Sequence, residues 1–168
     1  MAKIIWLTGL SGAGKSTISA KLKKNFKGKK CLVIDGDIFR KKTKQNSFSK
    51  KNIVKNNLKI INYCKKNFKN YVYIIVSVIS PLRKTRKIAS RIFKQNYFEI
   101  YVFANLKTLE KRDTKGLYKL SKKEIVKNLI GSKSGIKYEK SHYKYLKLNT
   151  NKFTKKQCMI KVLKYVGA

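Results

Sequence analysis

Acidic residues, proline, histidine and long apolar runs are all scarce in this chain of 168 residues. Only 7 Asp and Glu accompany 43 Lys and Arg, so the formal net charge is +36. No apolar run is long enough to cross a bilayer and no signal-peptide pattern opens the chain, so we expect a cytoplasmic protein without a membrane partner. The single histidine, His142, lies in a polar stretch, and we expect it at the surface rather than in catalysis.

Cysteine is scarce as well. Cys31, Cys64 and Cys158 stand far apart, each in an apolar stretch. Their spacing matches neither a set of metal ligands nor a disulfide framework. We therefore expect three reduced and buried thiols.

The positive charge would attract any polyanion at low salt. Lysine is spread over nearly every segment, whereas arginine occurs only at positions 40, 83, 86, 91 and 112. A groove dedicated to nucleic acid would use arginine forks at specific places. We expect non-specific binding of polyanions and no specific nucleic-acid partner, and a nucleic-acid-associated ATPase is the alternative from another class.

The hydrophobic residues, 42% of the chain, form short runs that alternate with segments at helical spacing. This pattern predicts one α/β domain over residues 1–168, with a mostly parallel five-stranded sheet flanked by helices. The expected strands are residues 4–8, 31–34, 71–78, 98–103 and, more weakly, 145–148. The expected helices include residues 54–61, a helix that begins near Pro81, and a C-terminal helix around residues 162–166.

A polar segment from residue 113 to about residue 143 interrupts this alternation. It has glycines at 116, 131 and 135, and it is too long for an ordinary connection. Segments of that size in compact domains are typically lids or binding loops, so we predict a mobile cover over a site. A disordered segment without a role is the alternative.

The segment GLSGAGKS at residues 9–16 matches the phosphate-binding pattern G-x-x-x-x-G-K-[ST]. It lies between a predicted strand and a predicted helix, which is the context that the pattern requires. Backbone N–H groups of such a loop surround phosphate oxygens, Lys15 reaches the outer phosphates, and Ser16 is the expected Mg²⁺ ligand. These features predict a P-loop NTPase fold. The missing guanine-reading motif and the lid-like segment favour a kinase over a GTPase.

The segment VIDGDIFR at residues 33–40 places Asp35 and Asp37 just after the second predicted strand. Ligands of open α/β sheets bind at the carboxyl ends of strands, so both carboxylates should face the P-loop crevice. They could hold Mg²⁺ or accept the proton of an attacking hydroxyl, although Asp-Gly is also a common turn dipeptide. Arg40 could bind an anionic acceptor.

Together with these segments, the stretches SVISPLRKTR, EIYVFANLKTLEKRDTKGLYK and NLIGS resemble the adenylylsulfate kinase family over almost the whole chain. Members are P-loop kinases that phosphorylate the ribose 3′-hydroxyl of adenosine 5′-phosphosulfate (APS). The resemblance implies ATP and Mg²⁺ as cofactors, a nucleotide as acceptor, and a homodimer.

The resemblance also implies residue roles. The catalytic residues would be Asp37, Lys15 and Ser80, and the metal ligands Ser16 and Asp37. The ATP-binding residues would be Gly9, Ser11, Gly12, Ala13, Gly14, Lys15, Ser16, Thr17 and Arg112. The acceptor-binding residues would be Asp35, Arg40, Phe48, Asn56, Ile79, Ser80, Lys115, Lys119 and Leu129. Family members are often given a phosphoserine intermediate at the serine matched by Ser80, but direct transfer makes it unnecessary, and we expect a site-lining hydroxyl.

Three departures from the family pattern concern the acceptor. Ile53 replaces a second arginine, unless Lys50 or Lys51 substitutes for it; Leu129 replaces an aromatic residue of the lid, and Lys133 an aspartate. One face of base stacking is thereby lost. APS is the expected acceptor, and cytidine diphosphoramidate, the acceptor of a related kinase in bacterial capsule biosynthesis, is the alternative.

Overall fold

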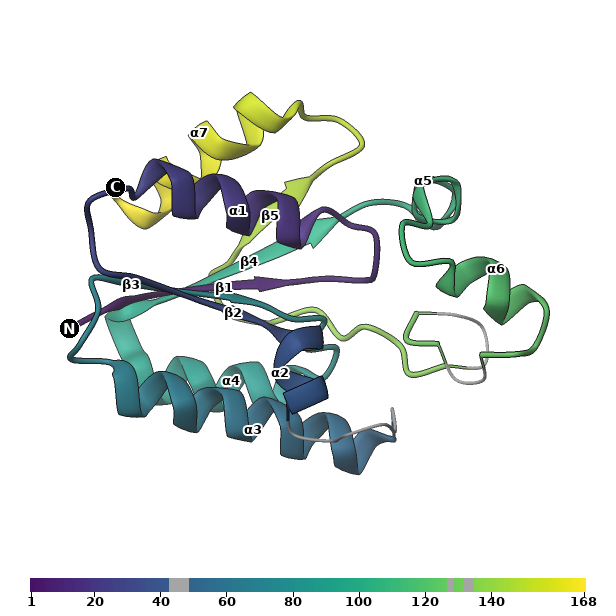
Figure 1. The fold of residues 1–168 in the computed structure, drawn as a ribbon, viewed down its shortest axis with the longest axis horizontal. Helices are drawn as coiled ribbons and strands as arrows, with labels where there is room; N and C mark the ends of the chain where they lie inside the picture. Colours follow the sequence, from purple (N-terminus) through teal and green to yellow (C-terminus); the bar gives the residue numbers. More distant parts are fainter. Residues whose placement is uncertain (43–48, 127–128, 132–134) are drawn as a thin grey trace.

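The computed structural model describes residues 1–42, 49–126, 129–131 and 135–168. Its centre is a five-stranded sheet in the order β2-β3-β1-β4-β5, in which all pairings are parallel (Figure 1). The strands are β1 Lys3–Thr8, β2 Cys31–Asp35, β3 Tyr73–Ser77, β4 Tyr97–Phe103 and β5 Leu146–Asn149. The predicted α/β fold and parallel sheet are confirmed.

Helices cover both faces of this sheet. In Figure 1, α1 Lys15–Asn25 and α7 Lys155–Val166 lie on one face, and α3 Lys50–Asn67 and α4 Arg83–Phe93 lie on the other. The short α2 Gly36–Lys42 follows β2, and a 3-10 turn, Lys94–Asn96, leads into β4. Two further helices, α5 Leu106–Arg112 and α6 Leu117–Lys122, lie beyond the carboxyl ends of the strands.

The core is divided by the sheet because successive side chains of a strand point to opposite faces. On β1, Ile5 and Leu7 pack in the cluster that includes Leu22 of α1, whereas Trp6 packs in the cluster that includes Ile60 of α3. A strand buried on both faces reads as a continuous apolar run, which is why this one could be recognised from the sequence.

The expectation of buried thiols holds for two of the three cysteines but not for Cys31, and the expected exposure of His142 holds. Cys64 and Cys158 are buried, Cys31 is half-buried, and all three are free thiols. His142 is exposed. Among the described helices, none is long and apolar enough to cross a membrane.

Part of the predicted lid segment packs against the core rather than standing apart from it. Tyr118, Leu129 and Ile130 are 5%, 8% and 2% exposed. Tyr138 stacks on Tyr101 of β4 with a centroid distance of 4.5 Å. The segment reads as polar because lysine and other polar residues dominate it, and its apolar residues occur only singly or in adjacent pairs. They are buried through contacts with distant parts of the chain.

A buried ion pair fastens the end of this segment to the sheet. Arg86 of α4 and Glu99 of β4 are 0% and 1% exposed, and Nε lies 3.1 Å from Oε1. The Glu99 carboxylate also accepts hydrogen bonds from Ser141 Oγ and Tyr143 OH, both at 2.6 Å. Arg86 in turn donates to the backbone carbonyl of Glu139. This network, which the sequence analysis did not predict, holds residues 139–143 in place.

We predict that Glu99→Gln lowers the free energy of unfolding by about 3–5 kcal/mol, because it leaves the Arg86 guanidinium buried without its counter-charge. Urea denaturation measures the change. Glu110→Gln is the matched control, since the Glu110–Lys122 pair is exposed and such pairs contribute about 0–1 kcal/mol. An equal effect of both substitutions would contradict the assigned role of the buried pair.

Candidate active site

A cavity of about 820 Å³ opens at the carboxyl ends of the strands. Ligand pockets in proteins typically have volumes of this order. Its wall includes the P-loop, the start of α2, the end of α5 and residues of the lid segment. Among the wall residues are Ser16, Asp35, Asp37, Arg112, Lys115 and Leu129. Segments far apart in the sequence therefore enclose one space.

The P-loop begins where β1 ends, and its first glycine is required by the backbone. Gly9 has φ +142°, and a Cβ at this position would collide with the carbonyl oxygen of Val102 on β4. Gly14, with φ +101°, is the N-cap of α1 and leaves the first turn without a side-chain cap. The free N–H groups at this end of the helix are suited to bind phosphate.

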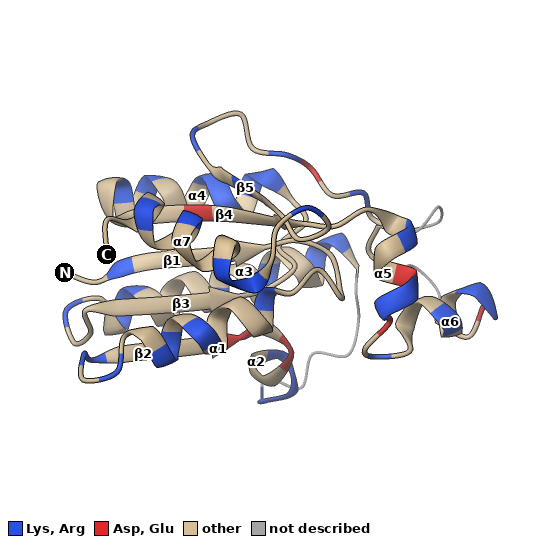
Figure 2. Ribbon diagram, turned by 90° about the horizontal axis from the view of Figure 1, so that it is seen from above, with Lys and Arg blue, Asp and Glu red and all other residues tan. Residues whose placement is uncertain are grey.

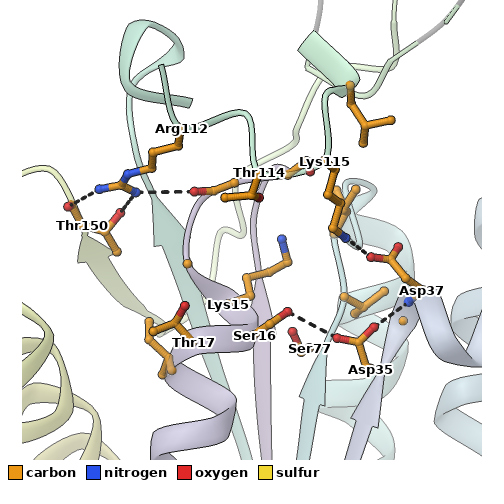
Figure 3. A pocket seen from close by; sticks show the side chains of 18 of the residues that line it. Lys15, Ser16, Thr17, Asp35, Asp37, Ser77, Arg112, Thr114, Lys115 and Thr150 are labelled. Atoms are coloured by element: carbon orange, nitrogen blue, oxygen red, sulfur yellow. Dashed lines mark hydrogen bonds and ion pairs between the residues drawn. The ribbon is translucent and has the colours of Figure 1, made fainter. Parts of the chain in front are cut away.

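Lys15 points into the cavity from the first turn of α1 (Figure 3). Its ammonium group donates a hydrogen bond of 2.8 Å to the carbonyl oxygen of Leu10. Burial, and then the charge of Lys115, lower its pKa to about 8, against the opposing effect of Asp37 and Asp35. The phosphate chain of a bound nucleotide would place negative charge next to this ammonium group.

The two carboxylates occupy different positions. Asp35 ends β2 and accepts hydrogen bonds from Ser16 Oγ at 3.3 Å and from the backbone N–H of Asp37 at 2.9 Å. Asp37 lies in the first turn of α2 and forms an ion pair with Lys115. Partial burial acts to raise the pKa of Asp37, but Lys115, Arg40 and Lys15 outweigh it, so the pKa is lowered. Asp37 is therefore ionised at neutral pH.

Arg112 and Thr150 form the opposite wall (Figure 3). Arg112 donates to Thr150 Oγ1 at 3.0 Å and to the Thr150 carbonyl oxygen at 2.9 Å. Thr150 Oγ1 donates to the carbonyl oxygen of Ala13, so this wall is tied to the P-loop. Thr150 was not predicted from the sequence, although it lies two residues after the weakly predicted strand 145–148, at the edge where ligands of such sheets bind.

Most of the predicted site residues meet at the cavity. Those in its wall are Ser11, Gly12, Gly14, Lys15, Ser16, Thr17, Asp35, Asp37, Arg40, Ile79, Arg112, Lys115 and Leu129. Phe48 and Lys133 lie outside the described residues. The wall also contains polar residues that the sequence analysis did not name, among them Ser77, Thr114 and Lys155.

Five predicted residues are absent from the wall: Gly9, Ala13, Asn56, Ser80 and Lys119. Gly9 and Ala13 lie behind the P-loop surface, and Lys119 is exposed on α6. Asn56 is 2% exposed on the inner side of α3, and neither polar atom of its side chain has a hydrogen-bond partner in the described part of the chain.

Ser80 differs most from expectation. It is 1% exposed, its backbone has φ 42°, and its hydroxyl lies 3.5 Å from Thr85 Oγ1 at the start of α4. The hydroxyl therefore points into the protein rather than lining the cavity. The turn before Pro81 explains this orientation, because it directs the side chain toward α4.

Two of the positions that depart from the family pattern, Ile53 and Leu129, are apolar in the structure. Ile53 is 4% exposed and packs with Leu82 and Ile130 in a small apolar cluster. Its position supplies no cation to the cavity. Leu129 is in the cavity wall, where it presents an aliphatic surface.

The oxygen atoms on the carboxylate side suit Mg²⁺. This ion keeps several waters and is usually bound through one or two protein groups and substrate phosphates. Ser16 and Asp35 are hydrogen-bonded neighbours, and Asp37 follows two residues later. The described residues contain no group of three or more His, Cys, Asp and Glu side chains that could enclose a metal. The residues present thus fit an ion held mainly by phosphate and water.

A P-loop at the centre of a parallel sheet, with carboxylates and cations around one cavity, defines a P-loop nucleotide-binding protein of the kinase type. The family model for adenylylsulphate kinase matches residues 1–149. The chain belongs to the adenylylsulphate kinase family.

Relatives and solved structures agree with this assignment. The chain is 34% identical to the adenylyl-sulfate kinase of Phocaeicola vulgatus, over 97% of this chain and 81% of the relative. It is 37% identical to the probable adenylyl-sulfate kinase of Pyrococcus abyssi, over 89% and 86% of the two chains. The structure of the Mycobacterium tuberculosis APS kinase in complex with AMPPNP and APS superposes with a TM-score of 0.85 at 25% identity, over 97% and 98%.

We predict that ATP binding takes up protons through Lys15. Bound phosphate raises the pKa of this lysine above about 8, so uptake is larger at about pH 8.5, where the free lysine is mostly neutral, than at about pH 7. Calorimetric titrations in buffers of different ionisation enthalpy measure it. Affinity should also fall as the pH rises through this range. Equal proton uptake at both pH values would contradict the lowered pKa.

Proposed function

We propose that the chain is an ATP-dependent kinase that transfers the γ-phosphoryl group of ATP to the ribose 3′-hydroxyl of APS, giving 3′-phosphoadenosine 5′-phosphosulfate. The observation that carries this proposal is that one cavity has both Lys15 of the P-loop and the ionised Asp37 in its wall. Family membership and the similarity to an APS kinase that binds AMPPNP and APS support the choice of donor and acceptor.

The residues divide between donor and acceptor. The P-loop N–H groups and Lys15 bind the phosphates of ATP, and Arg112 lies on the same side of the cavity, beside Gly12 and Thr150. Arg40 is placed to bind an anionic group of the acceptor. Ser16, with Asp35 or Asp37, would hold Mg²⁺, which would supply positive charge toward the transferring phosphoryl group.

Asp37 acts on the hydroxyl that attacks. Its ionised carboxylate orients the 3′-hydroxyl and accepts its proton, which requires that Lys115 release part of its present contact. Lys115 belongs to the lid segment, so acceptor binding and lid position are coupled through this pair. The lid then excludes water that would otherwise hydrolyse ATP.

We predict that Asp37→Asn lowers kcat by about 10²–10⁴-fold, because the amide cannot accept the proton. ATP affinity, measured by calorimetry without Mg²⁺, should change little, since the P-loop is unaltered. Glu110→Gln is a matched control on α5, away from the cavity wall, and should retain full activity. Full activity of Asp37→Asn would refute the assigned role.

Cytidine diphosphoramidate, the acceptor of a related kinase in capsule biosynthesis, is a second candidate acceptor. The observation that favours it is the apolar pair Ile53 and Leu129, where the family has a cation and an aromatic residue. A smaller base and a phosphoramidate would need less aromatic surface and one cation fewer.

Steady-state kinetics with both acceptors separate the candidates. We predict a kcat/KM at least about tenfold higher for APS, a difference that a few polar contacts can supply. A preference for cytidine diphosphoramidate would replace APS in the proposal. A ratio near one would show that the altered positions do not select the acceptor.

A nucleic-acid-associated ATPase is the alternative from another class. Lys and Arg are distributed over the helices and loops in Figure 2 rather than gathered in one stripe. This distribution supports non-specific attraction of polyanions, which salt screens, and not a dedicated groove. The homodimer and the cytoplasmic location stay predictions.

A further inference from the structure

Ser77, the last residue of β3, has a buried hydroxyl whose hydrogen-bonding capacity is not used by the described residues. The residue is 4% exposed, and its Oγ atom has no hydrogen-bond partner within the described part of the chain. A buried hydroxyl that is left unsatisfied is unfavourable for folding. Ser77 nevertheless belongs to the cavity wall, so a ligand could supply the missing partner.

The sheet register places this hydroxyl beside Asp35, on the metal side of the site. Ser77 is paired with Asp35 on β2 and with Leu7 on β1. Paired residues of adjacent parallel strands point to the same face, and the strands lie about 4.8 Å apart. That face is covered by α1, because Leu7 packs in the cluster that includes Leu22.

Figure 3 shows the resulting group of three. Ser77 lies next to Ser16 and Asp35, which are joined by their 3.3 Å hydrogen bond. A serine hydroxyl can donate one hydrogen bond and accept two. Mg²⁺ bound beside Ser16 would keep several waters, and these waters need acceptors in the surrounding wall.

We infer that Ser77 is a positioning residue for Mg²⁺. The Ser77 hydroxyl would accept a hydrogen bond from a water of the ion's hydration shell. Asp35 would accept from the same shell, and Ser16 would contact the ion. This inference rests on the MgATP part of the proposed function and is independent of the acceptor.

A purely structural role makes a different prediction. Ser19 of α1 is 3% exposed, and its Oγ is also without a partner among the described residues. Ser19 does not belong to the cavity wall. If Ser77 were only a small buried residue, Ser77→Ala and Ser19→Ala would behave alike.

The test compares these two variants with the unchanged chain in Mn²⁺ binding, measured by electron paramagnetic resonance in the presence of AMPPNP and without acceptor. We expect Ser77→Ala to weaken Mn²⁺ binding about tenfold, as is typical when an outer-shell partner is removed. Ser19→Ala should bind Mn²⁺ like the unchanged chain. Thermal unfolding should be similar for all three.

AMPPNP binding in the presence of a chelator separates a metal effect from damage to the P-loop, and Ser77→Ala should leave it unchanged. Equal Mn²⁺ binding by Ser77→Ala and the unchanged chain would overturn the inference alone. Loss of metal-free AMPPNP binding in Ser77→Ala would also overturn it. If the unchanged chain bound no Mn²⁺ with AMPPNP, the proposed function itself would fail.

Discussion

The passage of the chain from β1 into α1 is the constraint on which the site depends. β1 lies at the centre of the sheet, so the loop that follows it opens between the ends of β3 and β4. Gly9 permits this course because no side chain fits against Val102. The same register brings Ser77 and Asp35 beneath the start of α1. Donor phosphates, metal and acceptor can therefore meet at one edge.

The few acidic residues are used at specific places in a chain of net charge +36. Asp35 and Asp37 are at the cavity, and Glu99 is in the core. Asp113 accepts the backbone N–H groups of Tyr118 and Lys119 at the start of α6, and Glu139 accepts that of Arg83. The remaining excess of cations attracts anionic nucleotides to the cavity but adds no selectivity by itself.

Local patterns explain what could be predicted from the sequence, and long-range contacts explain what could not. The P-loop and four of the strands show in short segments with a clear pattern, whereas the fifth strand and the two carboxylates give weaker local signals. The Arg86–Glu99 network joins α4, β4 and residues 139–143, and no local pattern marks it. The inward orientation of Ser80 and the place of Thr150 at the cavity likewise depend on how distant segments pack.

The most direct test of the account is the identity of the reaction product. Phosphorus NMR of the purified chain with ATP, Mg²⁺ and APS should show ADP together with a new phosphomonoester on the ribose 3′ oxygen, and neither should form without APS. Release of inorganic phosphate at a rate independent of APS would contradict the proposed transfer.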